Sequence, residues 1–261
     1  MPSIEENLRA WEHDHNWPQA GDEWSQWWGG PEAQWFASVY PRIHTFIPAP
    51  RILEIAPGFG RWTQFLKNHC EHLTVVDLTA ACIEACKKRF LAESHINYYV
   101  NDGKSLEMIP DKSVDFAFSF DSLVHVEADV IEAYLDQLAR KLRANGVGFI
   151  HHSNIGTFID SKTSRLSIEN AHWRAESMTS SLFEEFCDKA NLQCINQELV
   201  NWGENDKSYL IDCFSIFTPK DSTWARPNKV IANGKFWEEA QQIERLSHGY
   251  TFKSRQPVSD F

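Results

Sequence analysis

The sequence has no apolar run long enough to cross a membrane and no excess of positive charge. No stretch approaches the roughly 18 consecutive apolar residues that a membrane-spanning helix needs. Residues 1–16 are polar and acidic, without the basic-then-apolar order of a secretory signal. The formal net charge of −11 opposes attraction to nucleic acid and to anionic lipid. These absences predict a cytoplasmic protein with a small or neutral partner, no nucleic acid and no membrane; no signal indicates an oligomeric state.

Closely spaced cysteine pairs of the C-x-x-C type are also absent, although the sequence has six cysteines. Cys82 and Cys86 are four residues apart on an expected helix, and the other four are scattered along the chain. Thiols stay reduced in the cytoplasm. We therefore expect buried free thiols, with a zinc site or a disulfide as the alternatives.

Repeats, low-complexity tracts and Gly/Ser linkers are missing as well, so the 261 residues fit one large α/β domain. From residue 51, short apolar runs alternate with helical patterns, which indicates βαβ units and a mostly parallel sheet. Strands are expected at residues 51–55, 72–76, 96–100, 114–120 and 147–151, and a closing antiparallel pair near residues 193–200 and 208–217.

Helix signals fall between these strands. Thr79 can cap a helix that reaches Phe90, and residues 130–142 place an apolar stripe on one helical face. Asn145-Gly146 is expected to turn the chain into the fifth strand. Ser181 and Glu184 have the spacing of a capping box in front of a late helix.

Two flanks lie outside this pattern, so we divide the chain into an N-terminal flap (residues 1–48), a core (49–218) and a C-terminal extension (219–261) with one expected helix near residues 236–246. Six of the eleven tryptophans fall before residue 36. These indole rings can pack on the core. Alternatively, they form a lid that offers flat aromatic faces to a ring-shaped acceptor such as a sugar.

The most informative stretch is Glu54-Ile-Ala-Pro-Gly-Phe-Gly-Arg-Trp-Thr63, directly after the first strand. Glycines there let the backbone approach a ligand closely. Asp77 ends the second strand, 17 residues after Gly60, where an acid can accept hydrogen bonds from both hydroxyls of a ribose. Asp102-Gly103 follows the third strand, where a carboxylate can meet an adenine amino group. The pattern predicts a nucleoside lying across the carboxyl edge of the sheet.

This order resembles class I S-adenosylmethionine-dependent methyltransferases, whose first motif reads acid-x-Gly-x-Gly-x-Gly. The sequence supplies Glu54, Gly58 and Gly60 and has Ala56 at the first glycine position, which alanine fits if its backbone stays in the β region. The resemblance covers roughly residues 50–155. It implies a Rossmann-like fold: a mostly parallel seven-stranded sheet with an antiparallel last strand and helices on both faces. It also implies S-adenosylmethionine as methyl donor and S-adenosylhomocysteine as product.

The same resemblance implies the cofactor site. Gly58 and Gly60 would line the methionine and ribose moieties, Asp77 would hold the ribose and Asp102 the adenine, and the segment from Ser119 to Ser122 would line the pocket. The full expected set is Glu54, Ala56, Gly58, Gly60, Asp77, Leu78, Asp102, Gly103 and Ser119. A nicotinamide dehydrogenase is the competing interpretation, but its Gly-x-Gly-x-x-Gly fingerprint needs a glycine where this chain has Thr63.

Polar residues that could act on the acceptor follow the fourth and fifth strands. Asp121 and His125 come after the fourth strand, and His151 and His152 end the fifth. Histidine titrates near working pH and suits proton abstraction. Since successive strand residues point to opposite faces, only one of His151 and His152 can face the acceptor. The candidate catalytic residues are therefore His125, His151, His152 and Asp121.

We expect O-methylation of a hydroxyl on a small molecule or glycan. Three segments, Trp-Ser-Gln-Trp-Trp-Gly29, Gly-Arg-Trp-Thr63 and His-His-Ser-Asn154, together look similar to bacterial small-molecule and glycan methyltransferases. The alternatives are N-methylation of a small amine and an inactive cofactor-binding module. Asp121 and the histidines have the chemistry to hold a divalent cation, but their spacing does not support one, and no metal site is predicted. The loop with His172 and Arg174 either closes over the acceptor or is a plain surface loop.

Overall fold

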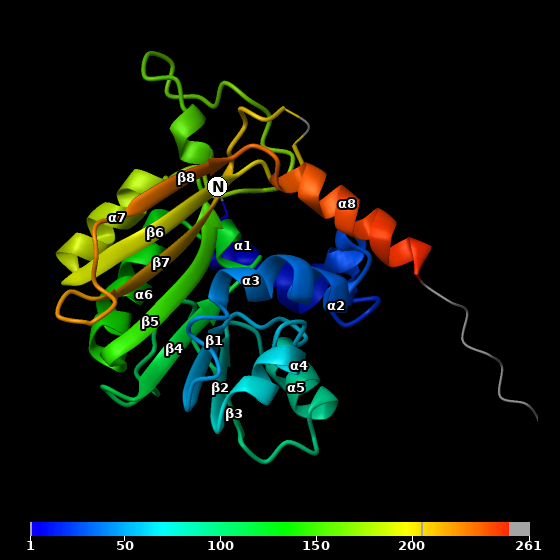
Figure 1. The fold of residues 1–261 in the computed structure, drawn as a ribbon, viewed down its shortest axis with the longest axis vertical. Helices are drawn as coiled ribbons and strands as arrows, with labels where there is room; N and C mark the ends of the chain where they lie inside the picture. The colour runs from blue at the N-terminus through cyan, green and yellow to red at the C-terminus, as the bar shows by residue number, and fades with distance from the viewer. Residues whose placement is uncertain (1, 205, 251–261) are drawn as a thin grey trace, which may run out of the picture.

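The computed structural model describes residues 2–204 and 206–250, and one eight-stranded sheet runs through it (Figure 1). The strand order is β3-β2-β1-β4-β5-β7-β6-β8. The strands are β1 (Arg51–Ile55), β2 (His72–Asp77), β3 (Ile96–Val100), β4 (Val114–Ser119), β5 (Leu142–Ser153), β6 (Leu192–Val200), β7 (Asp212–Pro219) and β8 (Lys229–Asn233). Within the described residues, β7 alone runs against its neighbours, pairing antiparallel with both β5 and β6.

The expected seven-stranded sheet is corrected to eight strands. The additional strand, β8, comes from the C-terminal extension and pairs in parallel with β6, with Asn196 opposite Lys229. Four of its five residues are exposed, so it lacks the alternation of apolar and polar residues that marks a strand in a sequence. Pairing with β6 therefore creates a strand that the residue pattern does not encode.

Helices cover both faces of the sheet, each over its own apolar cluster. One face carries α6 (Ala128–Lys141) and α7 (Ser180–Lys189). The other carries α2 (Pro31–Gln34), α3 (Tyr40–Ile43), α4 (Thr63–Leu66), α5 (Ala80–Arg89) and α8 (Phe236–Gly249). Figure 1 shows α6 and α7 on one side of the strands and α4 and α5 on the other. The apolar stripe predicted for residues 130–142 lies on α6 and is buried.

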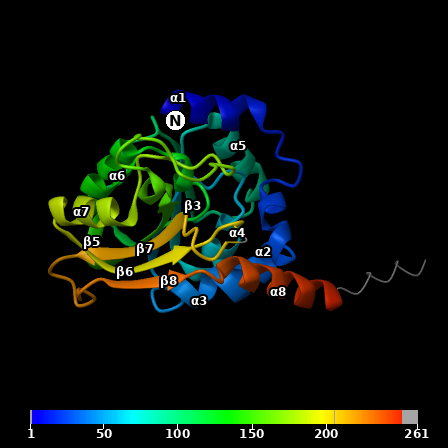
Figure 2. The same cartoon turned by 90° about the horizontal axis from the view of Figure 1, so that it is seen from above.

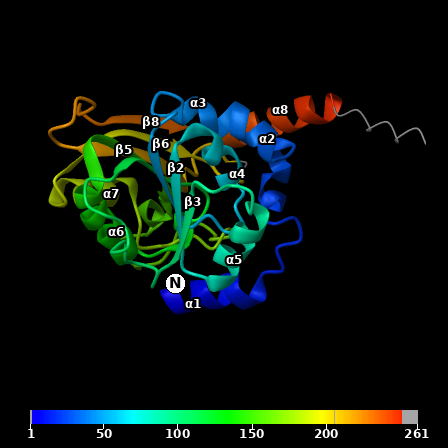
Figure 3. The same ribbon diagram turned by 90° about the horizontal axis from the view of Figure 1, so that it is seen from below.

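The N-terminal segment wraps around the molecule. It begins with α1 (Ile4–Arg9), continues into a π-helical turn (Ala10–Asp14), and passes through a 3₁₀ helix (Asp22–Trp28) to α2, a second π-helical turn (Trp35–Val39) and α3. Figures 2 and 3 show α1 on the opposite side of the molecule from α3 and α8, with the blue chain running between them past α5. One of its tryptophans, Trp35, packs on the core: it is buried and stacks on Phe65 with ring centroids 5.0 Å apart.

The structure confirms one of the local signals and corrects two others. The Thr79 cap is confirmed, because its side chain accepts a hydrogen bond from the backbone N–H of Cys82. The Ser181 capping box is wrong: α7 starts earlier, and Thr179 caps it by accepting from the N–H of Leu182. The turn at residues 145–146 is a register shift inside β5 rather than a break before it. Each miss concerns where an element begins, which tertiary pairing decides.

The expectation that Ala56 stays in the β region is also wrong. Its φ is 57°, in the left-handed region that alanine rarely adopts. Its N–H donates to the carbonyl of Val76 at 2.8 Å, and its carbonyl accepts from Ser122 Oγ at 2.8 Å. These two bonds hold the first residue after β1 in a turn that glycine would adopt without strain.

No helix within residues 2–204 and 206–250 has both the length and the apolarity that crossing a membrane requires. Over the same ranges, no group of three or more His, Cys, Asp or Glu side chains is placed to hold a metal ion. All six cysteines are free; Cys70 is half-buried and the other five are buried.

We predict that Ala56→Gly leaves the protein as stable or makes it up to about 1.6 kcal/mol more stable, because relief of about 1–2 kcal/mol of left-handed strain equals or exceeds the cost of the greater chain entropy of unfolded glycine, about 0.4–1 kcal/mol. Urea unfolding measures the difference. The matched control, Ala133→Gly within α6, should lose about 1 kcal/mol. An equal loss in both variants would contradict strain at Ala56.

Candidate active site

A cavity of about 670 Å³ opens at the carboxyl ends of the parallel strands. Its volume lies within the range of about 300–1,000 Å³ that is usual for ligand pockets. Residues after β1, β2 and β4 line it, together with the loop that carries Arg174. The N-terminal segment closes a side of the same space. Groups that could hold a nucleoside and groups that could meet a second molecule therefore share one chamber.

Asp77, the last residue of β2, lies at the nucleoside end. Its side chain accepts hydrogen bonds from the Thr79 N–H at 2.9 Å and from the Gly58 N–H at 3.1 Å. Burial raises the pKa of Asp77 to about 6, although hydrogen bonds from Thr79 and Gly58 act to lower it. The carboxylate is thereby tied to the glycine loop and borders the cavity.

The glycine loop meets the cavity through Ala56 and Gly58. Gly58 has a φ of 58°, and a Cβ there would lie 2.9 Å from a ring carbon of Trp17. Gly60 does not line the cavity as expected; a Cβ on it would lie 2.5 Å from the ring of Phe90, so it allows packing against α5. Gly58 thus borders the cavity, whereas Gly60 allows close packing in the core.

Glu54 lies behind the loop instead of in the cavity. It is buried and accepts a hydrogen bond from Thr63 Oγ1 at 2.6 Å. Burial raises the pKa of Glu54 to about 8, so its carboxyl is largely protonated at neutral pH. Thr63 stands where the dinucleotide fingerprint needs glycine, and its structural partner is Glu54 of β1.

Some of the remaining expected cofactor residues line the cavity, and others do not. Leu78 and Gly103 line the cavity. Asp102 does not: it is exposed, and its Oδ1 accepts from the N–H groups of Lys104 and Ser105 in a local turn. Ser119 is fully buried behind the lining, whereas Ser122 reaches the cavity. The structure thus does not bring the predicted adenine acid, Asp102, to the chamber.

Indole rings form much of the wall. Nine of the eleven tryptophans line the cavity, five of them from the N-terminal segment. Those five are Trp11, Trp17, Trp24, Trp27 and Trp28. The other four, Trp62, Trp173, Trp202 and Trp237, come from loops and helices of the core and the extension. The N-terminal segment therefore contributes more than half of the indole rings at the cavity.

Asp121 follows β4 and is paired with an arginine from the glycine loop. Its Oδ2 accepts from Arg61 at 2.7 Å, and both side chains are at least nine-tenths buried. The Arg61 guanidinium also lies over the Trp62 ring, 4.6 Å from its centroid. The carboxylate therefore borders the cavity with its charge already compensated.

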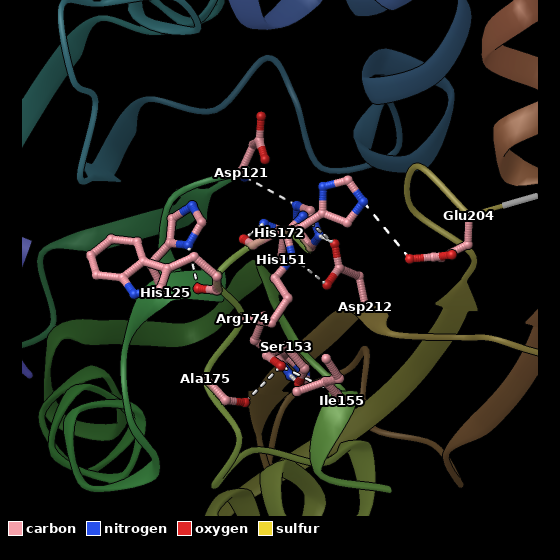
Figure 4. Close-up of polar contacts among 12 residues, drawn as sticks. Asp121, His125, His151, Ser153, Ile155, His172, Arg174, Ala175, Glu204 and Asp212 are labelled. Carbon is pink, nitrogen blue, oxygen red and sulfur yellow. Dashed lines mark hydrogen bonds and ion pairs between the residues drawn. The ribbon is translucent and has the colours of Figure 1, made fainter. Parts of the chain in front are cut away.

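His125 is the histidine of the predicted set that lines the cavity. Its ring packs against the indoles of Trp11 and Trp173, with centroids at 5.5 and 5.4 Å, and those two indoles also contact each other. The Nδ1 atom lies 2.9 Å from the carbonyl oxygen of Trp173, to which a protonated Nδ1 donates (Figure 4). Burial, and then the charge of Arg174, lower the pKa of His125 to about 4. The neutral ring keeps a lone pair on Nε2.

The other two histidines are buried on opposite faces of β5, as the alternation of strand residues requires. His152 stacks on Phe183 of α7, with centroids 4.4 Å apart, and its Nε2 lies 2.8 Å from Ser215 Oγ. His151 packs beside Phe120, and its two ring nitrogens contact Asp212 and the backbone N–H of Asp121. Neither ring lines the cavity.

Sequence reasoning missed a buried ion pair at the far end of the cavity. Arg174 donates to Asp212 through Nε at 2.9 Å and through a terminal nitrogen at 2.7 Å. Nearby, His172 Nε2 lies 3.8 Å from Glu204, also shown in Figure 4. Asp212 begins a strand whose other residues are apolar or small, so no motif marks it.

Part of this chain is similar to known methyltransferases. Residues 52–146 match a family model described as a methyltransferase domain. A phosphoethanolamine N-methyltransferase from Triticum aestivum is 25% identical over 150 residues, which are 56% of this chain. The chain spans 30% of the length of that curated relative.

Solved structures share the fold. A protein from Pyrococcus horikoshii OT3 has a TM-score of 0.56 at 18% identity, covering 72% of this chain and 91% of its own. An S-adenosylmethionine-dependent methyltransferase from Clostridium acetobutylicum has a TM-score of 0.55 at 12% identity, with coverages of 71% and 91%. Residues 52–146 carry the matched methyltransferase domain, and the core around them has the fold of these solved structures.

Proposed function

We propose that the protein transfers a methyl group from S-adenosylmethionine to a hydroxyl of a small ring-shaped molecule, a phenol or a sugar. The observation that carries this proposal is the single chamber, because it joins Asp77 and Gly58 to His125 and the tryptophan walls. A donor and an acceptor held in one enclosed space satisfy the main requirement of methyl transfer, which is alignment of the reacting atoms.

The residues at the nucleoside end fit the cofactor. Asp77 provides a buried carboxylate that can accept from ribose hydroxyls, and Gly58 has no side chain where the backbone borders the cavity. When bound, S-adenosylmethionine supplies an activated methyl group. We retain Ala56, Leu78 and Gly103 as further cofactor contacts on the same grounds.

His125 is the proposed base. The carbonyl of Trp173 favours the tautomer with the proton on Nδ1, so Nε2 can accept the hydroxyl proton as the new carbon–oxygen bond forms. Since the pKa of His125 is lowered to about 4, the imidazole is neutral at working pH but a weak base. That favours an acidic hydroxyl, such as a phenol with a pKa near 10.

The walls favour an uncharged acceptor. Arg61 is paired with Asp121 and Arg174 with Asp212, so these four charges are compensated in pairs. Indole faces offer large apolar contact to a flat ring. The free thiols and the net charge of −11 favour a cytoplasmic protein with a small partner rather than nucleic acid or a membrane.

N-methylation of a small amine is the second candidate. The indole walls that suit a flat ring also attract a cation, and the curated wheat relative is named as an N-methyltransferase. The two candidates differ in pH dependence. An amine must lose its proton before it attacks, so its rate rises towards the amine's own pKa, near 10 for a lysine-like group. A hydroxyl served by His125 should react at a rate that changes little between pH 6 and 8.

Asp77→Asn is predicted to weaken S-adenosylhomocysteine binding by about 10- to 100-fold, because hydrogen bonds to a charged acceptor contribute about 1.5–3 kcal/mol. In the unmodified protein the affinity should fall as pH decreases from 7 to 5, by about tenfold. The reason is that the pKa of Asp77 is raised to about 6 and the ribose prefers the ionised carboxylate.

Isothermal titration at both pH values measures this effect. In Asp77→Asn the difference between pH 7 and pH 5 should disappear. Asp102→Asn is the matched control, since this carboxylate also follows a strand but does not line the cavity, and its affinity should not change. Weaker binding in Asp102→Asn together with normal binding in Asp77→Asn would reverse the assignment.

His125→Gln is predicted to lower turnover by at least about a hundredfold, the usual contribution of a general base. Its affinity for S-adenosylhomocysteine should stay within about twofold of the unmodified protein. Transfer of labelled methyl from S-adenosylmethionine to a panel of phenols, sugars and amines measures turnover. His172→Gln is the control, because this ring also lines the cavity but its Nε2 faces Glu204. Full turnover in His125→Gln would rule out the base.

A further inference from the structure

Four cavity-lining residues other than glycine have backbone conformations that are uncommon for any residue with a side chain: Trp17, Ala56, Asp121 and Trp173. Asp121 has a φ of 59° and Trp173 a φ of 53°. Such conformations persist where the surrounding structure over-determines them, and they cluster at functional sites. The last two contact groups of the proposed mechanism: Asp121 pairs with Arg61, and the Trp173 carbonyl binds His125.

One buried carboxylate is connected to both Asp121 and Trp173. Asp212, the first residue of β7, is fully buried, as is His151, and Arg174 is 3% exposed. Asp212 contacts the guanidinium of Arg174 through both carboxylate oxygens and His151 Nε2 at 3.0 Å. Figure 4 shows Asp212 beside His151 and Arg174. We call these three side chains the Asp212 cluster.

The first connection runs through His151 to Asp121. The backbone N–H of Asp121 donates to His151 Nδ1 at 3.1 Å. Because Nδ1 accepts, the neutral ring carries its proton on Nε2 and donates it to Asp212. Both nitrogens are therefore occupied, and His151 orients the turn after β4 instead of receiving a proton from the acceptor.

The second connection runs through Arg174 to His125. Arg174 follows Trp173 directly, and the next residue, Ala175, donates its N–H to the Val124 carbonyl at 3.0 Å. The ion pair with Asp212 thus anchors the segment whose Trp173 carbonyl accepts from His125 Nδ1. That acceptor decides which ring nitrogen of His125 keeps a free lone pair.

The surroundings of the cluster strengthen these contacts. The rings of Phe120, Trp202 and Phe214 lie 4.7 to 4.9 Å from His151, measured between centroids. Burial acts to raise the pKa of Asp212, but the charge of Arg174 and the contact with His151 outweigh it and hold the pKa well below its usual range. Asp212 therefore stays ionised over the working pH range.

We propose that Asp212 is a positioning residue for this site: through His151 it holds the turn of Asp121, and through Arg174 it holds the Trp173 carbonyl that sets the tautomer of His125. This inference deepens the proposed function and depends on it for the role of His125. It predicts that loss of the Asp212 charge disturbs the acceptor end of the cavity and leaves the Asp77 end intact.

The test compares Asp212→Asn with Glu198→Gln. Glu198 makes the other bidentate pair, with Arg42 at 2.7 Å for both contacts, and neither residue lines the cavity. Nitrogen-15 spectra of histidine-labelled protein report which ring nitrogen carries the proton, and His125→Gln identifies the His125 signals. Isothermal titration with S-adenosylhomocysteine reports the cofactor end.

In the unmodified protein we expect His125 with its proton on Nδ1 and His151 with its proton on Nε2. In Asp212→Asn the His125 signals should shift to a mixture of tautomers, and cofactor affinity should stay within twofold. With an acceptor found in the methyl-transfer panel, kcat should fall ten- to a hundredfold more than in Glu198→Gln, which keeps the normal His125 spectrum. Arg174→Lys, which keeps the charge but loses the bidentate geometry, should show the same His125 mixture if Asp212→Asn does not fold.

A normal His125 spectrum in the folded variants would overturn the positioning role. If the proposed function is wrong, the result differs: the unmodified protein would not bind S-adenosylhomocysteine or transfer methyl groups. The His125 spectra of the unmodified protein and Asp212→Asn would still show whether the Asp212 cluster sets the tautomer of His125.

Discussion

The reversal of one strand determines what the far end of this cavity contains. In β1 to β5 the carboxyl ends of parallel strands meet at one edge of the sheet, so Asp77, Asp121 and His151 gather there from distant parts of the chain. Because β7 runs antiparallel to β5, its first residue lies at that same edge, with Asp212 opposite Ser153. A parallel strand would have placed Asp212 at the other end of the sheet, and the cluster with His151 and Arg174 could not form.

The apolar surroundings of Asp212 and Arg174 strengthen the attraction between their charges. Asp212 and Arg174 are enclosed by aromatic rings and backbone, where water does not screen their attraction. The same burial acts in the opposite direction on His125, whose charged form is disfavoured, so its ring is neutral and can accept a proton. At Asp77 the two effects oppose each other: burial raises the pKa, and hydrogen bonds from the Thr79 and Gly58 N–H groups offset part of that rise.

The N-terminal segment contacts both the proposed base, His125, and the glycine loop. Asn7 of α1 donates its side-chain amide to the His125 carbonyl at 2.7 Å, and Trp11 from the following turn packs on the His125 ring. Trp17 covers Gly58 at the nucleoside end. One continuous segment therefore contacts both halves of the chamber, which explains why so many tryptophans precede β1: each contributes a large apolar face without a charge that would need a partner.

The sequence by itself determined the order of the strands along the chain, the glycine turn and the acid after β2, because these depend on local periodicity and on backbone freedom at single positions. It also separated His151 from His152, since alternation in a strand requires no knowledge of neighbours. Only the tertiary structure decided that Gly60 serves the core, that Ala56 is left-handed, that Asp102 points away and that β8 exists. It alone brought Asp212 to His151, 61 residues apart. Those outcomes depend on which segments pair across the sheet, and pairing between distant residues leaves no periodic trace in either segment.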